Sequence, residues 1–289
     1  MPSLVGSEMC IRDRYPSYWG PLAYLHPEKD LRLVTENYIC RLNADLELTD
    51  YTKVEMLTLH EPIWEFVGLE DARLVKWDGS YFLVGVRRDT TTNGQGRMEL
   101  SEIELDKEMW TAQETDRMRI PAPGDDDSYC EKNWVPIIDR PFEFVKWSIP
   151  TEVVSVDPIT GASKTTVLRE SNWADKDQRG SSHVLPFGKH YISITHEVAL
   201  FNNYLGQKDA IYRHRLLVWD KKMNLLGASN SFSFLDARIE FCVGAAIHPN
   251  GKDVLLSFGY QDNAAFILRT PNTVITELVK EALANDNAK

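Results

Sequence analysis

The sequence predicts an all-β protein, a five-bladed β-propeller followed by a short C-terminal helix. Short runs rich in Val, Ile, Phe, Tyr and Trp follow one another between Leu31 and Leu268. Gly, Asp, Asn or Pro separates these runs, which is typical of β-strands joined by tight turns. Hairpin units of this kind recur along the chain, as blades do in a propeller. A long helical periodicity is found only in the segment 274–284.

Three pairs of apolar runs predict antiparallel hairpins. The turn of the first pair is Asp78-Gly79-Ser80, and Asp-Gly is a strong hairpin signal because both residues tolerate positive φ angles. The three pairs are Arg73–Trp77 with Tyr81–Val86, His183–Pro186 with Tyr191–His196, and Val243–His248 with Val254–Tyr260.

The number of blades follows from the repeat of these units. Units begin near Gly68, Glu131, Arg179 and Glu240, and we expect Leu31–Thr58 to form the remaining, first unit. Their spacing is wider than the roughly 40–50 residues of regular propeller repeats, but it leaves room for four strands and their loops. From the pattern alone, a large β-sandwich stays open as the alternative.

Length and composition bound the domain organisation. The 289 residues contain no Pro/Ser-rich linker, and single hydrophobic cores extend to roughly 250–300 residues. We therefore expect one domain over residues 15–289, which includes the C-terminal helix. One side of that helix is apolar, so we expect it to pack against the propeller edge or a partner chain. The apolar residues on this side are Val274, Leu278, Val279 and Leu283.

Charge and cysteine content exclude several classes of protein. The formal net charge of −11 argues against nucleic-acid binding, which needs a basic surface. No apolar run approaches the roughly 20 residues of a membrane-spanning helix. The four cysteines form no Cys-x-x-Cys pair, so we expect no structural metal, and they fit reduced thiols in a cytoplasmic protein.

The first fourteen residues are expected to be a non-native leader. They show no periodicity and resemble a translated adapter sequence. A secretory signal is the other reading, but the run Leu4-Val5-Gly6 is shorter than the roughly 7–15 apolar residues that a signal needs.

The segment Gly68-Leu69-Glu70-Asp71-Ala72-Arg73 is more polar than the strand that it enters. Glu70, Asp71 and Arg73 are costly to desolvate unless they are paired or functional. An ion pair between Asp71 and Arg73 that holds a blade together is the competing structural reading.

Two further segments combine cationic side chains with strand starts. In Glu131-Lys132-Asn133-Trp134, the Lys132 ammonium can neutralise an anion or pair with Glu131. In Arg179-Gly180-Ser181-Ser182-His183, small residues let the backbone approach a ligand closely, and Thr195-His196-Glu197 follows at the far end of the same hairpin. Histidines of this kind are more often structural than catalytic.

The remaining polar positions lie at a strand end and around a loop. Tyr260 and Asp262 end the last predicted strand, where a turn-capping Asp is the simpler reading. Arg87 and Arg97, with Arg88, flank the loop Asn93-Gly94-Gln95-Gly96, which can present anion-binding groups or carry solvated arginines.

Five segments in one order resemble a known family. They are Gly68–Arg73, Glu131-Lys132-Asn133-Trp134, Arg179–Ser182 with Thr195-His196, Tyr212-Arg213-His214-Arg215-Leu216, and Phe258–Asp262. Over Leu31–Leu268 the chain resembles the five-bladed propeller enzymes of the β-mannoside phosphorylase and mannosidase type, glycoside hydrolase family 130. It is most similar to a bacterial branch found beside glycosyltransferases.

The resemblance implies cleavage or formation of a β-mannosidic or related bond with inversion, by phosphorolysis, with Asp71 as the general acid. Inorganic phosphate would be a co-substrate, and no cofactor or metal is implied. The implied anion-binding residues are Lys132, Arg87, Arg97, His196 and Arg179. The implied substrate-binding residues are Glu70, Arg73, Asn133, Trp134, His183, Tyr260 and Asp262. Trp134 or Trp64 would stack on a sugar ring.

Two motifs depart from the phosphorylases. Those enzymes have Lys-Asp where this chain has Lys132-Asn133, and Tyr-His-Gly where it has Thr195-His196-Glu197. Hydrolysis therefore stays open, with Glu197, Glu240 or Asp262 as the base, and a hydrolase needs its two carboxyl groups roughly 6.5–9.5 Å apart. Mannosyl transfer and a non-catalytic carbohydrate-binding propeller also stay open.

The expected partner is a glycoside or oligosaccharide, with a homo-oligomer left open. Catalysis requires that Asp71, Lys132, His196 and Asp262 converge at one end of the central channel.

Overall fold

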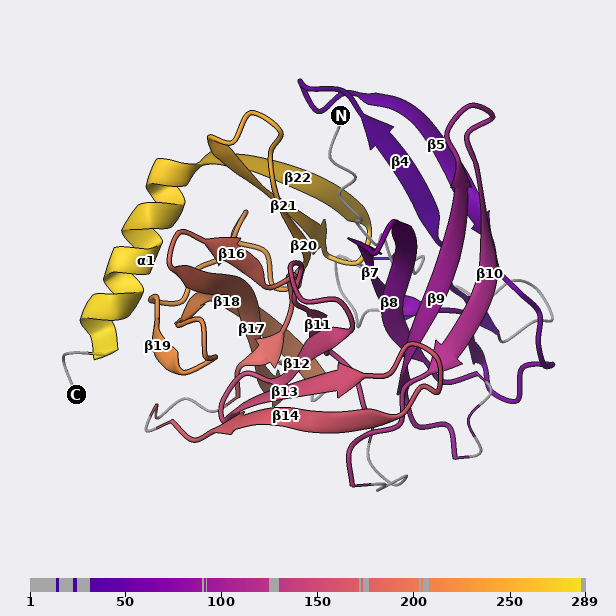
Figure 1. Ribbon diagram of the computed structural model, residues 1–289, viewed down its shortest axis with the longest axis horizontal. Helices are drawn as coiled ribbons and strands as arrows, with labels where there is room; N and C mark the ends of the chain where they lie inside the picture. The colour runs from indigo at the N-terminus through magenta and orange to yellow at the C-terminus, as the bar shows by residue number, and fades with distance from the viewer. Residues whose placement is uncertain are drawn as a thin grey trace.

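The computed structural model describes residues 14–15, 23–24, 32–89, 91, 93–124, 130–171, 173, 177–202, 204 and 208–286. The expected leader at positions 1–14 lies outside this part of the chain, apart from its last residue. The described residues are almost entirely β-strand and turn, with one C-terminal helix (Figure 1). The prediction of an all-β fold with a terminal helix is confirmed.

Four sheets of three or more strands form the described body of the protein. The first is ordered β4 (Tyr38–Leu42), β5 (Leu48–Glu55), β10 (Thr111–Arg119), β9 (Arg97–Asp106), β8 (Ser80–Arg87), β7 (Glu70–Trp77). The second is β11 (Val135–Pro136), β12 (Glu143–Trp147), β13 (Thr151–Val156), β14 (Ser163–Arg169). The third is β15 (Arg179–Gly180), β17 (His190–Asn202), β18 (Lys208–Trp219), β19 (Leu225–Ala228), with β16 (Leu185–Phe187) also on β17. The fourth is β20 (Glu240–Ile247), β21 (Asp253–Tyr260), β22 (Ala264–Pro271).

Two small pairs complete the described strands. β1 (Arg14–Tyr15) pairs with β2 (Ala23–Tyr24), and β3 (Leu33–Val34) pairs with β6 (Phe66–Val67). All three predicted hairpins are present, as β7/β8, β16/β17 and β20/β21. Asp78 and Gly79 both have positive φ, 48° and 95°, as a two-residue hairpin turn requires.

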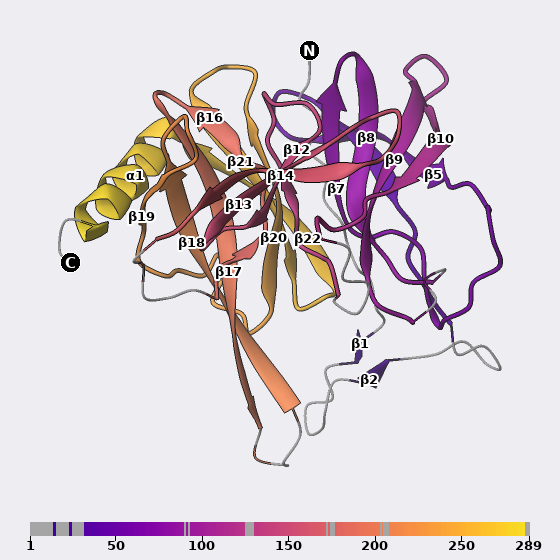
Figure 2. The ribbon, with the colours of Figure 1, turned by 60° about the horizontal axis from the view of Figure 1, so that its bottom comes forward.

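The sheets are arranged in a ring, as the blades of a propeller are (Figures 1 and 2). The strands at the sheet edges, β7, β11, β15 and β20, face the centre: β7 contacts both β11 and β20, and β15 contacts β12. A separate apolar cluster fills the space between each of three consecutive pairs of sheets. Sheet-on-sheet packing of this kind buries the apolar face of every blade.

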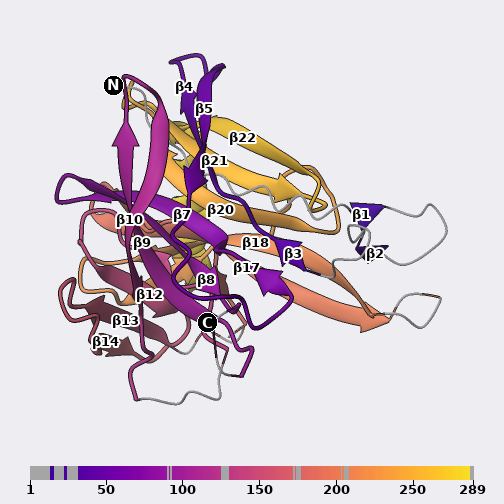
Figure 3. The same ribbon diagram turned by 90° about the vertical axis from the view of Figure 1, so that its right-hand side faces the viewer.

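The prediction of five blades is wrong for the described part of the chain, which forms four. The expected first unit contributes the hairpin β4/β5, which projects beside β22 (Figure 3). β5 runs parallel to β10 and pairs Val54 with Ala112, so the hairpin extends the first sheet instead of making its own. Ile39 and Val54 pack with Leu69 and Leu74 in one apolar cluster. An exposed β10 edge offers unpaired backbone groups, and β5 satisfies part of them.

Helix α1 (Asn272–Asp286) confirms the predicted C-terminal helix and lies against β18, β19, β21 and β22. Its buried residues are Ile275, Val279 and Ala282, and the predicted Leu278 and Leu283 pack partly buried against the same cluster. Of the predicted apolar face, only Val274 is exposed. A Cβ on Gly227 of β19 would lie 2.0 Å from the Ala282 carbonyl oxygen, so glycine permits this close packing.

Candidate active site

Residues at the starts of the central strands lie together. The Arg73 side chain of β7 is completely buried, and its Nε donates to the Ser181 carbonyl oxygen at 2.7 Å. Its guanidinium carbon lies 5.9 Å from the centre of the Phe241 ring of β20. Gly180 of β15 packs directly on the backbone of Asn133, which precedes β11. All four sheets therefore meet at this place.

Asp71 lies at an irregularity of β7. The pairing of β7 with β8 shifts between Glu70 and Arg73, and Asp71 has a φ of 53°. Arg73 Nη1 donates to the Asp71 carbonyl oxygen at 2.8 Å. A bulge of this kind re-aims a side chain away from the regular alternation of the strand, and such features are concentrated beside active sites. The Asp71 side chain is partly exposed.

His196 of β17 lies at the centre of the group. It is 3% exposed, and its Nδ1 lies 2.7 Å from Ser181 Oγ. The Tyr212 ring stacks on the imidazole at 5.6 Å, and the Phe241 ring meets it edge-on at 5.0 Å. These contacts fix the ring plane.

The pKa of His196 is lowered by burial and by charged groups around it. Its pKa lies well below the ordinary histidine value, and burial is the largest cause because it disfavours the charged imidazole. The neighbouring groups that lower the pKa further are His214, Arg179, Arg73 and Lys132. The imidazole is therefore neutral at neutral pH, within the field of Arg179 on β15, Arg73 on β7 and Lys132 in the segment before β11.

The three cations differ in exposure. Arg73 is buried, Arg179 is half-buried and Lys132 is exposed. Arg179 Nε pairs with Asp177 Oδ1 at 3.0 Å. The structure thus brings together the predicted residues Arg73, Arg179 and His196, with the Asp71 backbone held by Arg73. Lys132 precedes Asn133, whose backbone packs against Gly180.

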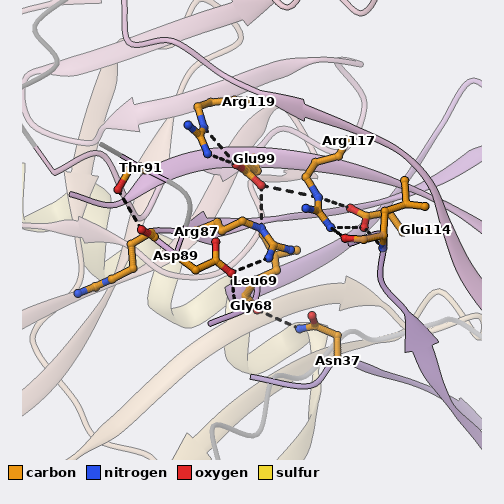
Figure 4. A network of polar contacts seen from close by, with 12 residues as sticks. Asn37, Gly68, Leu69, Arg87, Asp89, Thr91, Glu99, Glu114, Arg117 and Arg119 are labelled. Carbon is orange, nitrogen blue, oxygen red and sulfur yellow. Dashed lines mark hydrogen bonds and ion pairs between the residues drawn. The ribbon is translucent and has the colours of Figure 1, made fainter. Parts of the chain in front are cut away.

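Arg87 lies in a different cluster, a buried ion network on β8, β9 and β10 (Figure 4). Its Nε is 2.9 Å from Glu99 Oε2 and its Nη1 is 3.0 Å from Asp89 Oδ2. Arg117 pairs with Glu114, and Arg119 Nη2 lies 2.9 Å from Glu99 Oε1. The prediction that Arg87 binds a substrate anion overlooked these carboxylates, which already neutralise its charge.

The network was not predicted because its members are far apart in the sequence. A signal existed: Arg117 and Arg119 alternate along β10, as Glu99 and Ser101 do along β9, which marks a polar face. Burial acts to lower the pKa of Arg117, but its pairs with Glu114 and Glu99, and the nearby charge of Asp89, raise the pKa above the ordinary value. Arg97, opposite Arg87 in the ladder, is also buried, and its Nη1 donates to the Gly96 carbonyl oxygen.

His183 joins three sheets and has a structural position. Its Nε2 lies 3.0 Å from the Leu74 carbonyl oxygen, and the Ala245 amide donates to its Nδ1 at 3.1 Å. Burial, and then the charge of Arg73, lower its pKa to about 4. Both ring nitrogens are thus used by the backbone, which leaves neither for a substrate.

Trp134 is a core residue. It is completely buried, and its Nε1 donates to Glu131 Oε2 at 2.8 Å. Since neither ring face reaches solvent, the predicted stacking on a sugar fails for this residue. Trp64 is partly exposed, and its Nε1 donates to the Thr91 carbonyl oxygen. Asn133 is buried, with a φ of 63°.

Two of the three carboxylates proposed as bases, Glu240 and Glu197, are engaged. Glu240 is completely buried and accepts backbone amides of Leu235 at 2.8 Å and Ala237 at 2.9 Å. Glu197 Oε2 accepts from Gln178 Nε2 at 2.9 Å and lies 3.3 Å from Arg215 Nε. Glu240 holds the loop before β20, which is a structural task.

Three predicted substrate-binding residues remain: Tyr260, Asp262 and Glu70. Tyr260 and Asp262 are half-buried at the β21/β22 turn, and Asp262 has a φ of 52°. Glu70 is buried with its Oε2 3.8 Å from Arg88 Nη2. Among the described residues, no group of three or more His, Cys, Asp or Glu side chains is placed to hold a metal ion.

No protein-family model and no curated protein matches the chain. Among solved structures, it is similar to MPT-4, a mannose phosphorylase from Leishmania mexicana in complex with phosphate ion, with 10% identity, a TM-score of 0.46, and coverage of 84% of this chain and 77% of that one. It is also similar to MPT-1, a GDP-Man-dependent mannosyltransferase from the same organism, with 14% identity, a TM-score of 0.42, and coverage of 83% and 78%. No helix in the described part of the chain is long and apolar enough to cross a membrane.

Proposed function

We propose that the protein is a carbohydrate-active enzyme that cleaves or forms a β-mannosidic or related glycosidic bond with inversion, by phosphorolysis. The observation that carries this proposal is the meeting of Arg73, Arg179 and His196 at the centre of the ring: Arg179 is paired with His196 in the strand ladder, and Arg73 Nε donates to the Ser181 carbonyl oxygen. The charge of Lys132 acts on the same imidazole from farther away. Three cations beside a neutral imidazole favour a bound anion.

Phosphate as the nucleophile accounts for this charge. A phosphate dianion must be desolvated and held in line with the anomeric carbon, and fixed cations supply that binding without reorganisation. A buried cation is costly unless an anion balances it. Arg179 has Asp177 as a partner, whereas Lys132 is exposed. We assign Lys132 to the incoming phosphate.

Asp71 is the proposed general acid. Its carboxyl gives a proton to the glycosidic oxygen, directly or through a sugar hydroxyl, as the bond from that oxygen to the anomeric carbon breaks. A phosphate oxygen forms the new bond on the opposite face, which inverts the configuration. The products are a sugar 1-phosphate and the released alcohol, and the Asp71 carboxylate regains its proton in the next cycle. The bulge at Asp71, and the contact of Arg73 with its backbone, support this role.

Hydrolysis is the second candidate, and the carboxylates disfavour it. An inverting hydrolase needs a second carboxylate to activate water. Glu240 is committed to backbone amides, and Glu197 is held by Gln178 and Arg215. Asp262 is the remaining proposed base. Phosphorolysis needs no such base.

Product analysis tests the proposal. Purified protein is incubated with a panel of β-mannosides, with and without inorganic phosphate. We expect turnover only with phosphate, yielding a sugar 1-phosphate, and loss of turnover in Asp71→Asn with unchanged thermal unfolding. Free sugar released in phosphate-free buffer would establish hydrolysis instead. Turnover of no glycoside, with sugar binding retained, would favour the non-catalytic propeller.

A further inference from the structure

The hydroxyl of Ser181 has one partner. Ser181 is completely buried, and among the residues that the structure describes its Oγ contacts only His196 Nδ1, at 2.7 Å. A buried hydroxyl hydrogen without an acceptor is unfavourable, so the Ser181 hydroxyl donates to Nδ1. If Nδ1 carried the hydrogen instead, the Ser181 hydrogen would have no acceptor.

The position of the imidazole hydrogen follows from this contact. A neutral imidazole carries one hydrogen, and the bond that one nitrogen makes decides which nitrogen holds it. With Nδ1 as the acceptor, the hydrogen is on Nε2. Within the described part of the chain, Nε2 has no hydrogen-bond partner. Unlike the buried polar atoms that lack a partner, Nε2 keeps some exposure to solvent.

We propose that Ser181 is a positioning residue that holds His196 in the Nε2–H tautomer, so that the imidazole presents a neutral hydrogen-bond donor to an oxyanion in the candidate site. The ligand class rests on the proposed function, whereas the tautomer does not. Tyr212 and Phe241 fix the ring plane, and Ser181 fixes the direction of the donor.

One further contact ties the donor to the cations. The backbone carbonyl of Ser181 accepts from Arg73 Nε while its side chain bonds His196, so a single residue sets both groups. An oxyanion would then receive one neutral donor and the charges of Arg73, Arg179 and Lys132. His196 in this state donates from Nε2 and cannot serve as a base there.

The test uses the intact protein labelled with ¹⁵N in histidine. Long-range ¹H–¹⁵N correlation spectra at neutral pH distinguish the two neutral tautomers and the imidazolium, and His196→Gln assigns the signal. We expect the Nε2–H pattern for His196 in the wild-type protein. The Nδ1–H pattern or the imidazolium pattern would overturn the proposal, whatever the variants do.

Two neighbouring serines give a matched pair of variants. Ser181→Ala is expected to mix the tautomers of His196 and to weaken binding of inorganic phosphate roughly fivefold, the range of one hydrogen bond. Ser182→Ala removes an equally buried hydroxyl that bonds Ser193 and the Ile194 amide, and it should change neither readout. An unchanged tautomer in folded Ser181→Ala would overturn the role of Ser181. If wild-type protein shows the Nε2–H pattern but binds no phosphate, the proposed nucleophile fails and the tautomer assignment stands.

Discussion

Gly180 lies against the Asn133 backbone so closely that a Cβ on Gly180 would be 2.2 Å from the Asn133 carbonyl oxygen. The same Cβ would be 2.8 Å from Cγ1 of Val135. Gly180 belongs to β15 of the third sheet, and Asn133 precedes β11 of the second. The absence of a side chain therefore sets the spacing of two sheets beside Lys132 and Arg179.

Substitution Gly180→Ala should force these sheets apart. We expect the free energy of unfolding to fall by about 1–3 kcal/mol, the usual cost of overpacking, and phosphate binding to weaken. Urea unfolding and phosphate titration measure the two effects. Gly259→Ala in β21 is the control, because a Cβ there meets no atom within 4 Å. Wild-type stability in Gly180→Ala would contradict the close packing.

The buried ion network on β8–β10 gives a second prediction. Glu99→Ala removes the carboxylate that pairs with Arg87 and Arg119 and leaves buried positive charge uncompensated. We expect a loss of about 3–5 kcal/mol in the free energy of unfolding, measured in urea.

A double variant tests whether the loss of stability in Glu99→Ala comes from the unbalanced buried charge or from the lost attraction between the two side chains. Arg87→Met combined with Glu99→Leu should recover part of the loss, because the network then loses one positive and one negative charge together, although Asp89 and Arg119 each lose one partner. Breaking the exposed pair of Lys280 and Glu277 by Glu277→Ala should have no measurable effect. If Glu99→Ala matches that surface variant, the network does not stabilise the fold.

The pH dependence of stability follows from His183. Its pKa is about 4 in the folded protein, against roughly 6.5 in an unfolded chain. Below pH 6.5 the unfolded chain takes up a proton that the folded protein does not, so the free energy of unfolding falls as the pH falls. The loss is about 3 kcal/mol by pH 4 for this residue, and His214, with a pKa of about 3, acts in the same direction.

Variant His183→Gln removes this titration and keeps an amide donor and acceptor. We expect it to be less stable than the wild type at neutral pH and to lose less stability between neutral pH and about pH 5. Urea midpoints at both pH values give the slope. His60→Gln, at an exposed position, should keep the wild-type slope. An unchanged slope in His183→Gln would mean that His183 takes up its proton equally in the folded and unfolded states, which would contradict the lowered pKa.

Local patterns predicted the hairpins and the helix well, since the turn Asp78-Gly79 and the helical period act over a few residues. The blade count failed because it depends on whether β5 joins β10, a pairing between residues far apart in the chain. The same limit explains Arg87, whose polar neighbours in the sequence favoured a site but whose partner Glu99 lies on the next strand. Trp134 is buried because it packs with Met98 of the first sheet, which lies far away in the sequence.

Lys132 and Arg87 should respond in opposite ways to the same substitution. Lys132 is exposed and its charge acts on His196, so Lys132→Met should weaken phosphate binding roughly tenfold, as expected for a charged hydrogen bond, and leave unfolding nearly unchanged. Arg87→Met should lower the free energy of unfolding, because Glu99 and Asp89 lose their partner, while its folded fraction binds phosphate normally. Calorimetric titration measures phosphate binding by both variants, and urea unfolding measures their stability. Lys189→Met, at the exposed β16/β17 turn away from His196, controls for net charge. Loss of phosphate binding in a stable Arg87→Met would return Arg87 to the anion site and remove the assignment made from its carboxylate partners.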